Sequence, residues 1–285
     1  MKKFFLFVAA AAMSIAASAT DIWTGPKHVS WSEGGVQIAA NQFATAQPGN
    51  LLKVHFTGAT DGIEFKVMNA NFDHLAGSRE AAWIDGDGDF KQYLTQTAVD
   101  SLKLYGLELI GANFTCTKVE LLDESKILKD GFTVWTGFFW ADSWTTLELY
   151  WNGYAGVDWS KATALRIYSE AGRSDFVINV ILNAWPDQGG VNVANQEAMT
   201  AGEGYMELPL TDELRTKLAE ASKWMIQFNK EAGNPFNVTD VVLVMKDHTA
   251  IHNTAVETKA VKIIENGKMV IIKNGIRYNA LGAEL

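Results

Sequence analysis

The chain has 285 residues, 48% of them hydrophobic, and carries 24 basic and 33 acidic side chains, which gives a formal net charge of −9. Because an acidic surface repels the phosphate backbone, this balance excludes the nucleic-acid-binding class. The one cysteine, Cys116, excludes a disulfide within the chain and lies too far from the N-terminus to accept a lipid anchor after processing.

Residues 1–19 are predicted to be a secretory signal peptide. Two lysines precede a largely apolar run over residues 4–16, and Ala17, Ser18 and Ala19 form the small-residue pattern that signal peptidase accepts. The run is too short to remain as a membrane span, and no later stretch is apolar for long enough to form one. We therefore expect a secreted or cell-surface protein with no integral membrane span. Loss of the two lysines lowers its charge from −9 to −11.

Landmarks in the mature chain recur in the same order at a slowly growing offset, which indicates a tandem repeat. The recurring pairs are Trp23 with Trp135, Trp31 with Trp144, Leu94-Thr95 with Leu210-Thr211, and Phe114 to Leu121 with Phe236 to Leu243. The repeat predicts two modules, over residues 20–125 and 130–248, each the size of one β-sandwich domain.

Each copy contains short segments rich in β-branched and aromatic residues, and Gly, Asn and Asp separate them, which predicts strands and turns. Residues 145–151 alternate apolar and polar side chains, as a half-buried strand requires. One short helix is expected in each copy, over 95–104 and 212–221, because Thr95 and Thr211 can cap its first turn. We predict an all-β fold of two tandem antiparallel jelly-roll β-sandwiches, each with one short helix.

The last segment, residues 260–285, has the pattern of a small C-terminal β tail. Asn266-Gly267 and Asn274-Gly275 separate strand-like runs, so successive hairpins are expected. On the run from Ile271 to Gly282, the tail resembles the C-terminal sorting domain that the type IX secretion system of certain Gram-negative gut and oral bacteria recognises. This resemblance implies an extracellular or surface location.

A second resemblance lies in four segments of the first module. They are Trp23-Thr24-Gly25, the turn from Phe43-Ala44 to Pro48-Gly49, the helix start Leu94-Thr95, and Leu107 to Gly111 leading into Thr117-Lys118-Val119. On these segments the modules resemble galactose-binding-like jelly rolls, the carbohydrate-binding-module-like domains that such bacteria attach to glycan-degrading enzymes or export as glycan-binding proteins. The resemblance implies the fold, and function has to be argued from exposed side chains.

Ten tryptophans are a heavy load for this length, and a sugar-binding site needs an exposed aromatic ring with polar groups beside it. Tryptophans that recur in both copies are expected in the core, and so is Trp151, which shares a strand face with two leucines. The tryptophans expected in the core are Trp23, Trp31, Trp135, Trp144 and Trp151.

Aromatic residues present in one copy only, or placed where a strand enters a loop, are better candidates for ligand contact. Trp140 is expected in a turn, because three consecutive aromatics there cannot all point inward. Trp185 is expected to share a strand face with Asn179 and Asn183. The predicted ligand-binding residues are Trp140, Trp185, Asn183, Asp187, Phe72, Asn71 and Trp83.

Alternating carboxylates suggest Ca²⁺ at one place, since this ion prefers oxygen ligands. The weak metal candidates are Asp85, Asp87 and Asp89. Phe90 and Gln96 stand where an EF-hand-type loop needs Gly and Glu, so a solvated acidic turn before a strand is the alternative. We predict no cofactor, with calcium as the open alternative.

No familiar catalytic motif occurs in the sequence, and Cys116 lies in a predicted strand where a buried, inert thiol is expected. We therefore predict a non-enzymatic, exported protein that binds a polysaccharide or oligosaccharide through exposed aromatics. Two alternatives remain open. One is a surface adhesin or structural protein that recognises a protein through a broad apolar patch, and the other is a glycan-active enzyme with a carboxylate pair between the modules.

Overall fold

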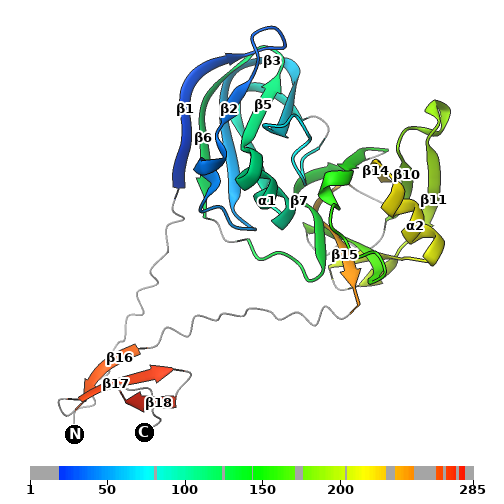
Figure 1. The fold of residues 1–285 in the computed structure, drawn as a ribbon. Coiled ribbons are helices and arrows are strands. Elements are labelled where there is room, and N and C mark those ends of the chain that lie inside the picture. Colours follow the sequence, from blue (N-terminus) through cyan, green and yellow to red (C-terminus); the bar gives the residue numbers. More distant parts are fainter. Residues whose placement is uncertain are drawn as a thin grey trace, which may run out of the picture. The chain divides into compact units, whose positions relative to one another are not determined.

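The computed structural model describes the chain from Ala19 onward, with short gaps. The described residues are 19–79, 82–123, 126–142, 144–170, 176–202, 204–228, 235–246, 261–265, 268–273 and 276–279. They form antiparallel β-strands and two short α-helices (Figure 1). The chain divides into two compact units, Met1–Lys246 and Asp247–Leu285. The predicted signal peptide lies outside the described residues, except for Ala19.

The first sandwich comprises six strands, one α-helix and one 3-10 helix. In chain order these are β1 (Ala19–Val29), β2 (Val36–Ile38), η1 (Ala40–Phe43), β3 (Leu51–Asn69), β4 (Ala82–Tyr93), α1 (Gln96–Tyr105), β5 (Leu107–Gly111) and β6 (Phe114–Leu122). The strands pair in the order β1-β6-β3-β5-β2, with β4 beside β3. All pairs are antiparallel, which confirms the predicted fold class.

Strand β3 belongs to both halves of this sandwich. Residues 51–57 pair with β6, whereas residues 65–69 pair with β5. Between these stretches, Gly58 and Gly62 have positive φ angles of 72° and 64°, and the register with β4 shifts on both sides of Ala59. Glycine adopts this left-handed backbone without steric cost, so the irregular stretch separates the two halves of β3.

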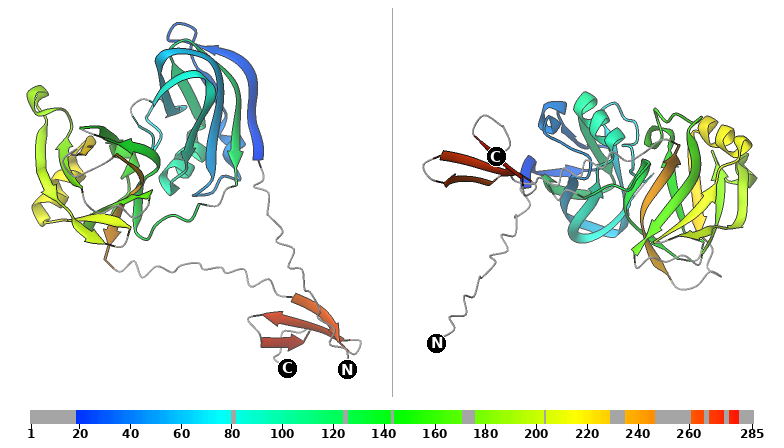
Figure 2. Two further views of the ribbon diagram at one scale, coloured as in Figure 1. Left: turned by 180° about the vertical axis from the view of Figure 1, so that it is seen from behind. Right: turned by 90° about the horizontal axis from the view of Figure 1, so that it is seen from below.

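The described residues of the second sandwich form nine strands, one α-helix and two short 3-10 helices. These are β7 (Phe132–Ala141), β8 (Thr146–Tyr150), η2 (Trp151–Gly153), β9 (Ala162–Ser169), β10 (Val177–Leu182), η4 (Pro186–Gln188), β11 (Val191–Ala198), β12 (Thr200–Gly202), β13 (Tyr205–Pro209), α2 (Asp212–Glu220), β14 (Lys223–Phe228) and β15 (Phe236–Met245). One sheet has the order β12-β13-β9-β15-β7 and the other β11-β10-β14-β8. Strands β9 and β10 thus pair as the two halves of β3 do in the first sandwich. Figure 2 shows the ribbon from two further sides.

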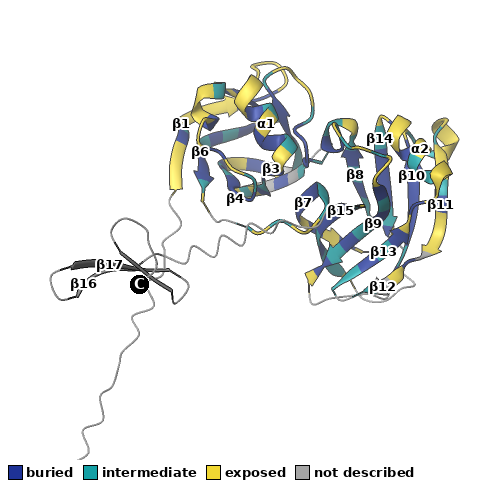
Figure 3. Ribbon diagram, turned by 60° about the horizontal axis from the view of Figure 1, so that its bottom comes forward, coloured by how far each residue is buried: buried dark blue, intermediate teal, exposed yellow. Residues whose placement is uncertain are grey.

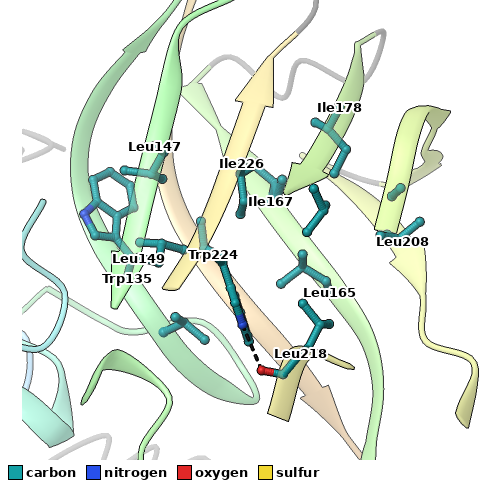
Figure 4. Packing of buried hydrophobic residues seen from close by; sticks show 14 of the residues in the cluster. Trp135, Leu147, Leu149, Leu165, Ile167, Ile178, Leu208, Leu218, Trp224 and Ile226 are labelled. Carbon is teal, nitrogen blue, oxygen red and sulfur yellow. Dashed lines mark hydrogen bonds between the residues drawn. The ribbon is translucent and has the colours of Figure 1, made fainter. Parts of the chain in front are cut away.

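Buried hydrophobic residues form a separate core cluster in each sandwich. Figure 3 colours the ribbon by how far each residue is buried. In the first, Phe114 packs edge-to-face on Phe65, with 5.5 Å between ring centroids. In the second, the fully buried Trp224 stacks on Tyr154 at 4.2 Å, and its Nε1 donates to the Leu218 carbonyl at 3.0 Å (Figure 4). The core therefore forms in two parts, while the module boundaries at 20–125 and 130–248 remain a prediction.

Both predicted helices are present. The Thr95 hydroxyl accepts a hydrogen bond from the Ala98 amide at 3.1 Å, and the Thr211 hydroxyl accepts one from the Leu214 amide at 3.1 Å. Each cap satisfies an amide that the first helical turn leaves without a partner. No helix in the described part of the chain combines the length and the apolar character needed to cross a membrane.

The second unit is a three-stranded antiparallel sheet. Its strands are β16 (Val261–Glu265), β17 (Lys268–Lys273) and β18 (Ile276–Asn279), paired in that order. The expected hairpins of a small C-terminal β tail are therefore confirmed, although the two Asn-Gly pairs lie outside the described residues. The resemblance to a sorting domain remains a prediction.

Three tryptophans that were expected in the core are exposed. Trp31 lies in the turn after β1, which the Gly34 amide closes onto the Ser30 carbonyl at 2.9 Å. Trp144 lies in the loop before β8 with a positive φ of 61°. Trp151 starts η2, where strand pairing has already ended, so the alternation of β8 no longer applies. By contrast, Trp135 is buried as predicted, and Trp23 is half-buried against the first core.

Two predicted turns are strands. Trp140 belongs to β7, where Phe138 and Trp140 point outward while Phe139 and Ala141 point inward. Because side chains alternate along a strand, only Phe139 of the three consecutive aromatics is buried. The acidic run that contains Asp87 lies within β4, paired with β3, and is not a solvated turn.

Candidate functional site

A groove of about 580 Å³ lies at the edge of the first sandwich, where the edge strands β1 and β2 come together. We call it the Trp31 groove. Its lining residues are Trp23, Lys27, Ser30, Trp31, Gly34, Gly35, Val36, Gln37, Phe72, Glu108 and Ile110. This volume falls within the range typical of small-molecule sites, and the lining mixes aromatic with polar side chains.

Two aromatic rings of the groove are exposed: Trp31 is 55% exposed and Phe72 is 59% exposed. The Trp31 turn is fixed by Ser30, whose hydroxyl accepts a hydrogen bond from the Glu33 amide at 3.1 Å. Lys66 lies 5.9 Å from the centre of the Trp31 ring, a cation–π distance that favours one ring orientation. Trp31 is therefore a positioned aromatic surface in contact with solvent.

The loop after β3 presents Phe72 in a strained conformation. Phe72 has a φ of 63°, a left-handed backbone that is rare for a bulky side chain. Asn69 holds the loop, because its side-chain oxygen accepts from the Asn71 amide at 2.9 Å and from the Asp73 amide at 3.1 Å. Strain of this kind persists where surrounding contacts enforce it, and it is concentrated at functional sites.

Glu108 supplies the buried polar group of the groove. It lies opposite Gln37 in the β2–β5 pair, and the neighbouring Leu107 and Leu109 are in the core. Only 2% of Glu108 is exposed, and its Oε2 has no hydrogen-bond partner among the described residues. Burial raises the pKa of this carboxyl, while a hydrogen bond from Gln37 and the charge of Lys27 oppose the rise.

Gly35 brings the turn against this carboxyl. A Cβ atom on Gly35 would lie 2.0 Å from the Leu109 carbonyl oxygen and 2.5 Å from Glu108 Oε1, both too close for any side chain. Glycine therefore permits the close approach of the turn and the strand. Sequence reasoning assigned Trp31 to the core and did not select Glu108. Glu108 could have been identified from the alternation of Leu107, Glu108 and Leu109 in the sequence, because side chains that alternate along a strand place Glu108 on the face opposite the two core leucines.

Of the predicted ligand-binding residues, Phe72 lies in the groove, with Asn71 exposed beside it. Trp140 is exposed on β7, opposite Asn237 of β15. Trp185 is half-buried before η4, and Asp187 is exposed within it. The side chain of Trp83 lies outside the described residues.

Trp140 and Trp185 do not lie together at one site. Asn183, two residues before Trp185, follows β10 at the Lys223 end of β14, because its amide donates to the Lys223 carbonyl at 2.9 Å. Trp140 precedes the loop whose Trp144 amide donates to the Phe228 carbonyl, at the other end of β14. The Asn183 side chain has a structural partner, since its oxygen accepts from the Ser222 amide at 2.8 Å. The predicted residues are thus divided among separate places.

In the second sandwich, a buried methionine stands where Glu108 stands in the first. There, β8 pairs with β14 as β2 pairs with β5, and Met225 lies opposite Glu148 where Glu108 lies opposite Gln37. Glu148 forms an ion pair with Lys223 at 2.9 Å. On the same strand, Tyr150 is covered by His74 of the first sandwich, with 4.0 Å between ring centroids and 17° between planes.

The acidic residues of β4 have structural partners. Asp87 accepts a hydrogen bond from the Gly58 amide at 2.8 Å, and Asp89 pairs with Lys53 at 2.9 Å and with His55 at 2.6 Å. The side chain of Asp85 lies outside the described residues. Within the described part of the chain, no three His, Cys, Asp or Glu side chains gather to hold a metal ion.

Cys116 is buried in β6, as predicted. Burial raises the pKa of its thiol to about 12. Because the thiolate is the reactive form, this cysteine stays protonated and unreactive near neutral pH.

No family model and no curated protein matches the chain. Among solved structures, the SGBP-B protein of the Bacteroides ovatus mixed-linkage glucan utilization locus, in complex with a mixed-linkage heptasaccharide, is 18% identical with a TM-score of 0.33. That match covers 36% of this chain and 28% of the other, so this chain spans under a third of that protein. A Parabacteroides distasonis protein, inferred to be secreted, is 9% identical with a TM-score of 0.18 and coverages of 81% and 84%. Function therefore has to be argued from the side chains of the groove.

Proposed function

We propose that the chain is a non-catalytic glycan-binding protein and that the Trp31 groove is its binding site. The observation that carries this proposal is the exposure of Trp31 and Phe72 in a groove whose other walls hold Lys27, Gln37 and Glu108. A sugar ring stacks its C–H face on an aromatic ring while its hydroxyls form hydrogen bonds to nearby polar groups. The exported location rests on the predicted signal peptide and on the resemblance of the tail.

The alternatives fit this groove less well. A protein-recognition surface is expected to be broad and apolar, whereas polar and charged side chains line this groove together with the aromatic rings. Glycoside hydrolysis needs two carboxyl groups about 5–10 Å apart. Among the described residues that line the groove, Glu108 is the one carboxylate. Binding without catalysis is therefore the function that these side chains support best.

Affinity electrophoresis over a panel of soluble polysaccharides tests the proposal. Trp31→Ala removes the exposed ring and should weaken binding at least about tenfold, as loss of a hot-spot aromatic does. Trp144→Ala is the matched control, because Trp144 is the recurring tryptophan of the second sandwich and is also exposed, at 48%. Retention of full affinity by Trp31→Ala, or failure of the unaltered protein to bind any polysaccharide, would count against the proposal.

Trp140, Trp185 and Asp187 remain proposed contacts outside the groove. Trp140 has polar neighbours, since Asn237 lies opposite it and donates to Glu170 at 2.8 Å. Alanine variants of the two tryptophans in the same electrophoresis would show whether a glycan polymer touches these places as well.

A further inference from the structure

We propose that Tyr150 of the second sandwich is a positioning residue of the glycan site, because it fixes, through His74, the loop that presents Phe72 to the Trp31 groove. This inference rests on the proposed function and adds that the one groove depends on both sandwiches. The loop follows β3, and its described residues are 70–79. We call it the Phe72 loop.

The first sandwich anchors the Phe72 loop on both sides of its exposed tip, residues 71–73. Before the tip, the Ala70 amide donates to the Gly106 carbonyl at 3.2 Å, and after it Leu75 is buried in the first core. The left-handed backbone of Phe72, with a φ of 63°, lies between these anchors. A strained backbone of this kind persists only where the contacts of its neighbours enforce it.

His74 is the first residue after the tip, and its ring stacks on Tyr150 of β8. The ring centroids are 4.0 Å apart, and the planes differ by 17°. The backbone of His74 is bridged to Met68 of β3. Both the ring and the backbone of His74 are therefore held, and they limit the movement of Phe72, which lies two residues earlier.

Two further contacts hold the rest of the Phe72 loop on the second sandwich. The guanidinium of Arg79 lies 4.9 Å from the centre of the Phe139 ring. A Cβ atom on Gly153 would lie 3.8 Å from the Gly77 amide nitrogen, so η2 lies against the loop as well. The part of the loop that follows the tip thus packs against the second sandwich.

Tyr150 is itself restrained, so it is a firm support for the loop. Lys223 lies opposite Tyr150 in the pair of β8 with β14, and its Nζ is 5.6 Å from the centre of the tyrosine ring. The same lysine pairs with Glu148 of β8 at 2.9 Å. A cation held beside the ring favours one ring orientation.

The face that carries this support corresponds to the groove face of the first sandwich, since β8 pairs with β14 as β2 pairs with β5. On it, Met225 lies opposite Ile181, and both are buried although neither belongs to the core cluster. A sugar ring therefore has no access to these two side chains. This face contributes to glycan binding through the Phe72 loop instead.

Affinity electrophoresis in gels that contain a soluble β-glucan, a galactomannan or a xylan tests this role. Tyr150→Ala and His74→Ala each remove the stack and should bind the retarding polymer about fivefold more weakly, because Phe72 must then be ordered on binding. Tyr150→Phe keeps the ring and should bind as the unaltered protein does. Tyr93→Ala is the matched control and should keep full affinity. It removes another aromatic contact between the sandwiches, 5.8 Å from the Phe138 ring centroid and outside the Phe72 loop.

Two measurements distinguish positioning from a general loss of stability. In a Phe72→Ala background, Tyr150→Ala should cause no further loss of affinity, because the ring that it positions is absent. Hydrogen exchange reports on the loop directly, since the Phe72 amide donates to the Asn69 carbonyl at 2.9 Å. Exchange in the Phe72 loop should be at least about threefold faster in Tyr150→Ala and unchanged in Tyr150→Phe.

Unchanged affinity of both Tyr150→Ala and His74→Ala would overturn the inference, whatever their exchange rates. A loss of affinity without faster exchange, or an equal loss with and without the Phe72 ring, would overturn it too. If Trp31→Ala loses binding while the two stack variants keep it, the glycan site stands and only the positioning role fails. If no polymer retards the unaltered protein, the proposed function fails and the inference fails with it.

Discussion

At the scale of single residues, the groove combines features that cost the free protein stability. Phe72 has a left-handed backbone with most of its ring exposed, and Glu108 holds a buried carboxylate with an oxygen that lacks a partner among the described residues. Neither arrangement improves the packing of the core. Residues of this kind are retained where activity or binding requires them, often at the expense of stability.

Phe72→Asn tests this trade-off, because asparagine tolerates the left-handed conformation that phenylalanine adopts with strain. Relief of strain, partly offset by lost contact of the ring, should raise the free energy of unfolding by roughly 0.5 kcal/mol. Glycan affinity should fall. Urea unfolding and affinity electrophoresis measure the two quantities, and a variant that is both less stable and equally tight in binding would disagree with this view of Phe72.

A second residue-scale prediction concerns acid stability. Hydrogen bonds from Lys118, at 2.6 Å, and from His55, at 2.5 Å, lower the pKa of Glu120 from 4.5 to about 2. Because the pKa is depressed in the folded state, the stabilisation is fully present above about pH 4.5 and is lost as the pH falls toward 2. Urea unfolding between pH 6 and about pH 2.5 should show this loss, and Glu120→Gln should flatten the dependence. If the stability of Glu120→Gln fell as steeply with pH as that of the parent protein, other groups would cause the pH dependence.

At the scale of elements, Lys126, in the segment between β6 and β7, contacts both sandwiches. Its Nζ lies 2.9 Å from Asp240 and 2.5 Å from the Thr136 hydroxyl in the second sandwich. Its backbone amide donates to the Gly49 carbonyl in the first sandwich at 3.1 Å. Asp240 is 1% exposed, so Lys126 is the cation that lies against its buried carboxylate.

Lys126→Met should therefore leave Asp240 as a buried charge without its counter-ion. We expect a loss of about 3–5 kcal/mol in the free energy of unfolding, which is typical when one partner of a buried pair is removed. The double variant with Asp240→Asn should recover much of that loss, because the charge is then absent. Unfolding curves that coincide for Lys126→Met and the parent protein would rule out this role.

Elements with local signals were predictable from the sequence. Thr95 and Thr211 mark helix starts by their capping hydroxyls, and the structure has both caps. Trp151 was placed wrongly, because alternation within β8 does not reveal that pairing with β14 stops at Tyr150. The prediction for Trp31 is wrong because recurrence in both copies does not distinguish a turn from a core position.

At the scale of the whole molecule, two sandwiches with corresponding strands differ on the face where the groove lies. The first sandwich exposes Trp31 and buries Glu108 there, whereas in the second Met225 replaces the carboxylate and His74 covers Tyr150. The recurrence of segments predicted the similarity of the two halves. It did not predict this difference, because the strand register decides that Met225 lies where Glu108 lies, and because His74 and Tyr150, which stack between the sandwiches, lie far apart in sequence.

Direct calorimetric titration of a soluble neutral oligosaccharide into the unaltered protein, Trp31→Ala and Trp144→Ala tests the central claim most directly. We predict one site per chain, near-normal affinity in Trp144→Ala and at least about tenfold weaker binding in Trp31→Ala. Unchanged binding in Trp31→Ala, or a loss confined to Trp144→Ala, would contradict the assignment of the Trp31 groove as the glycan site.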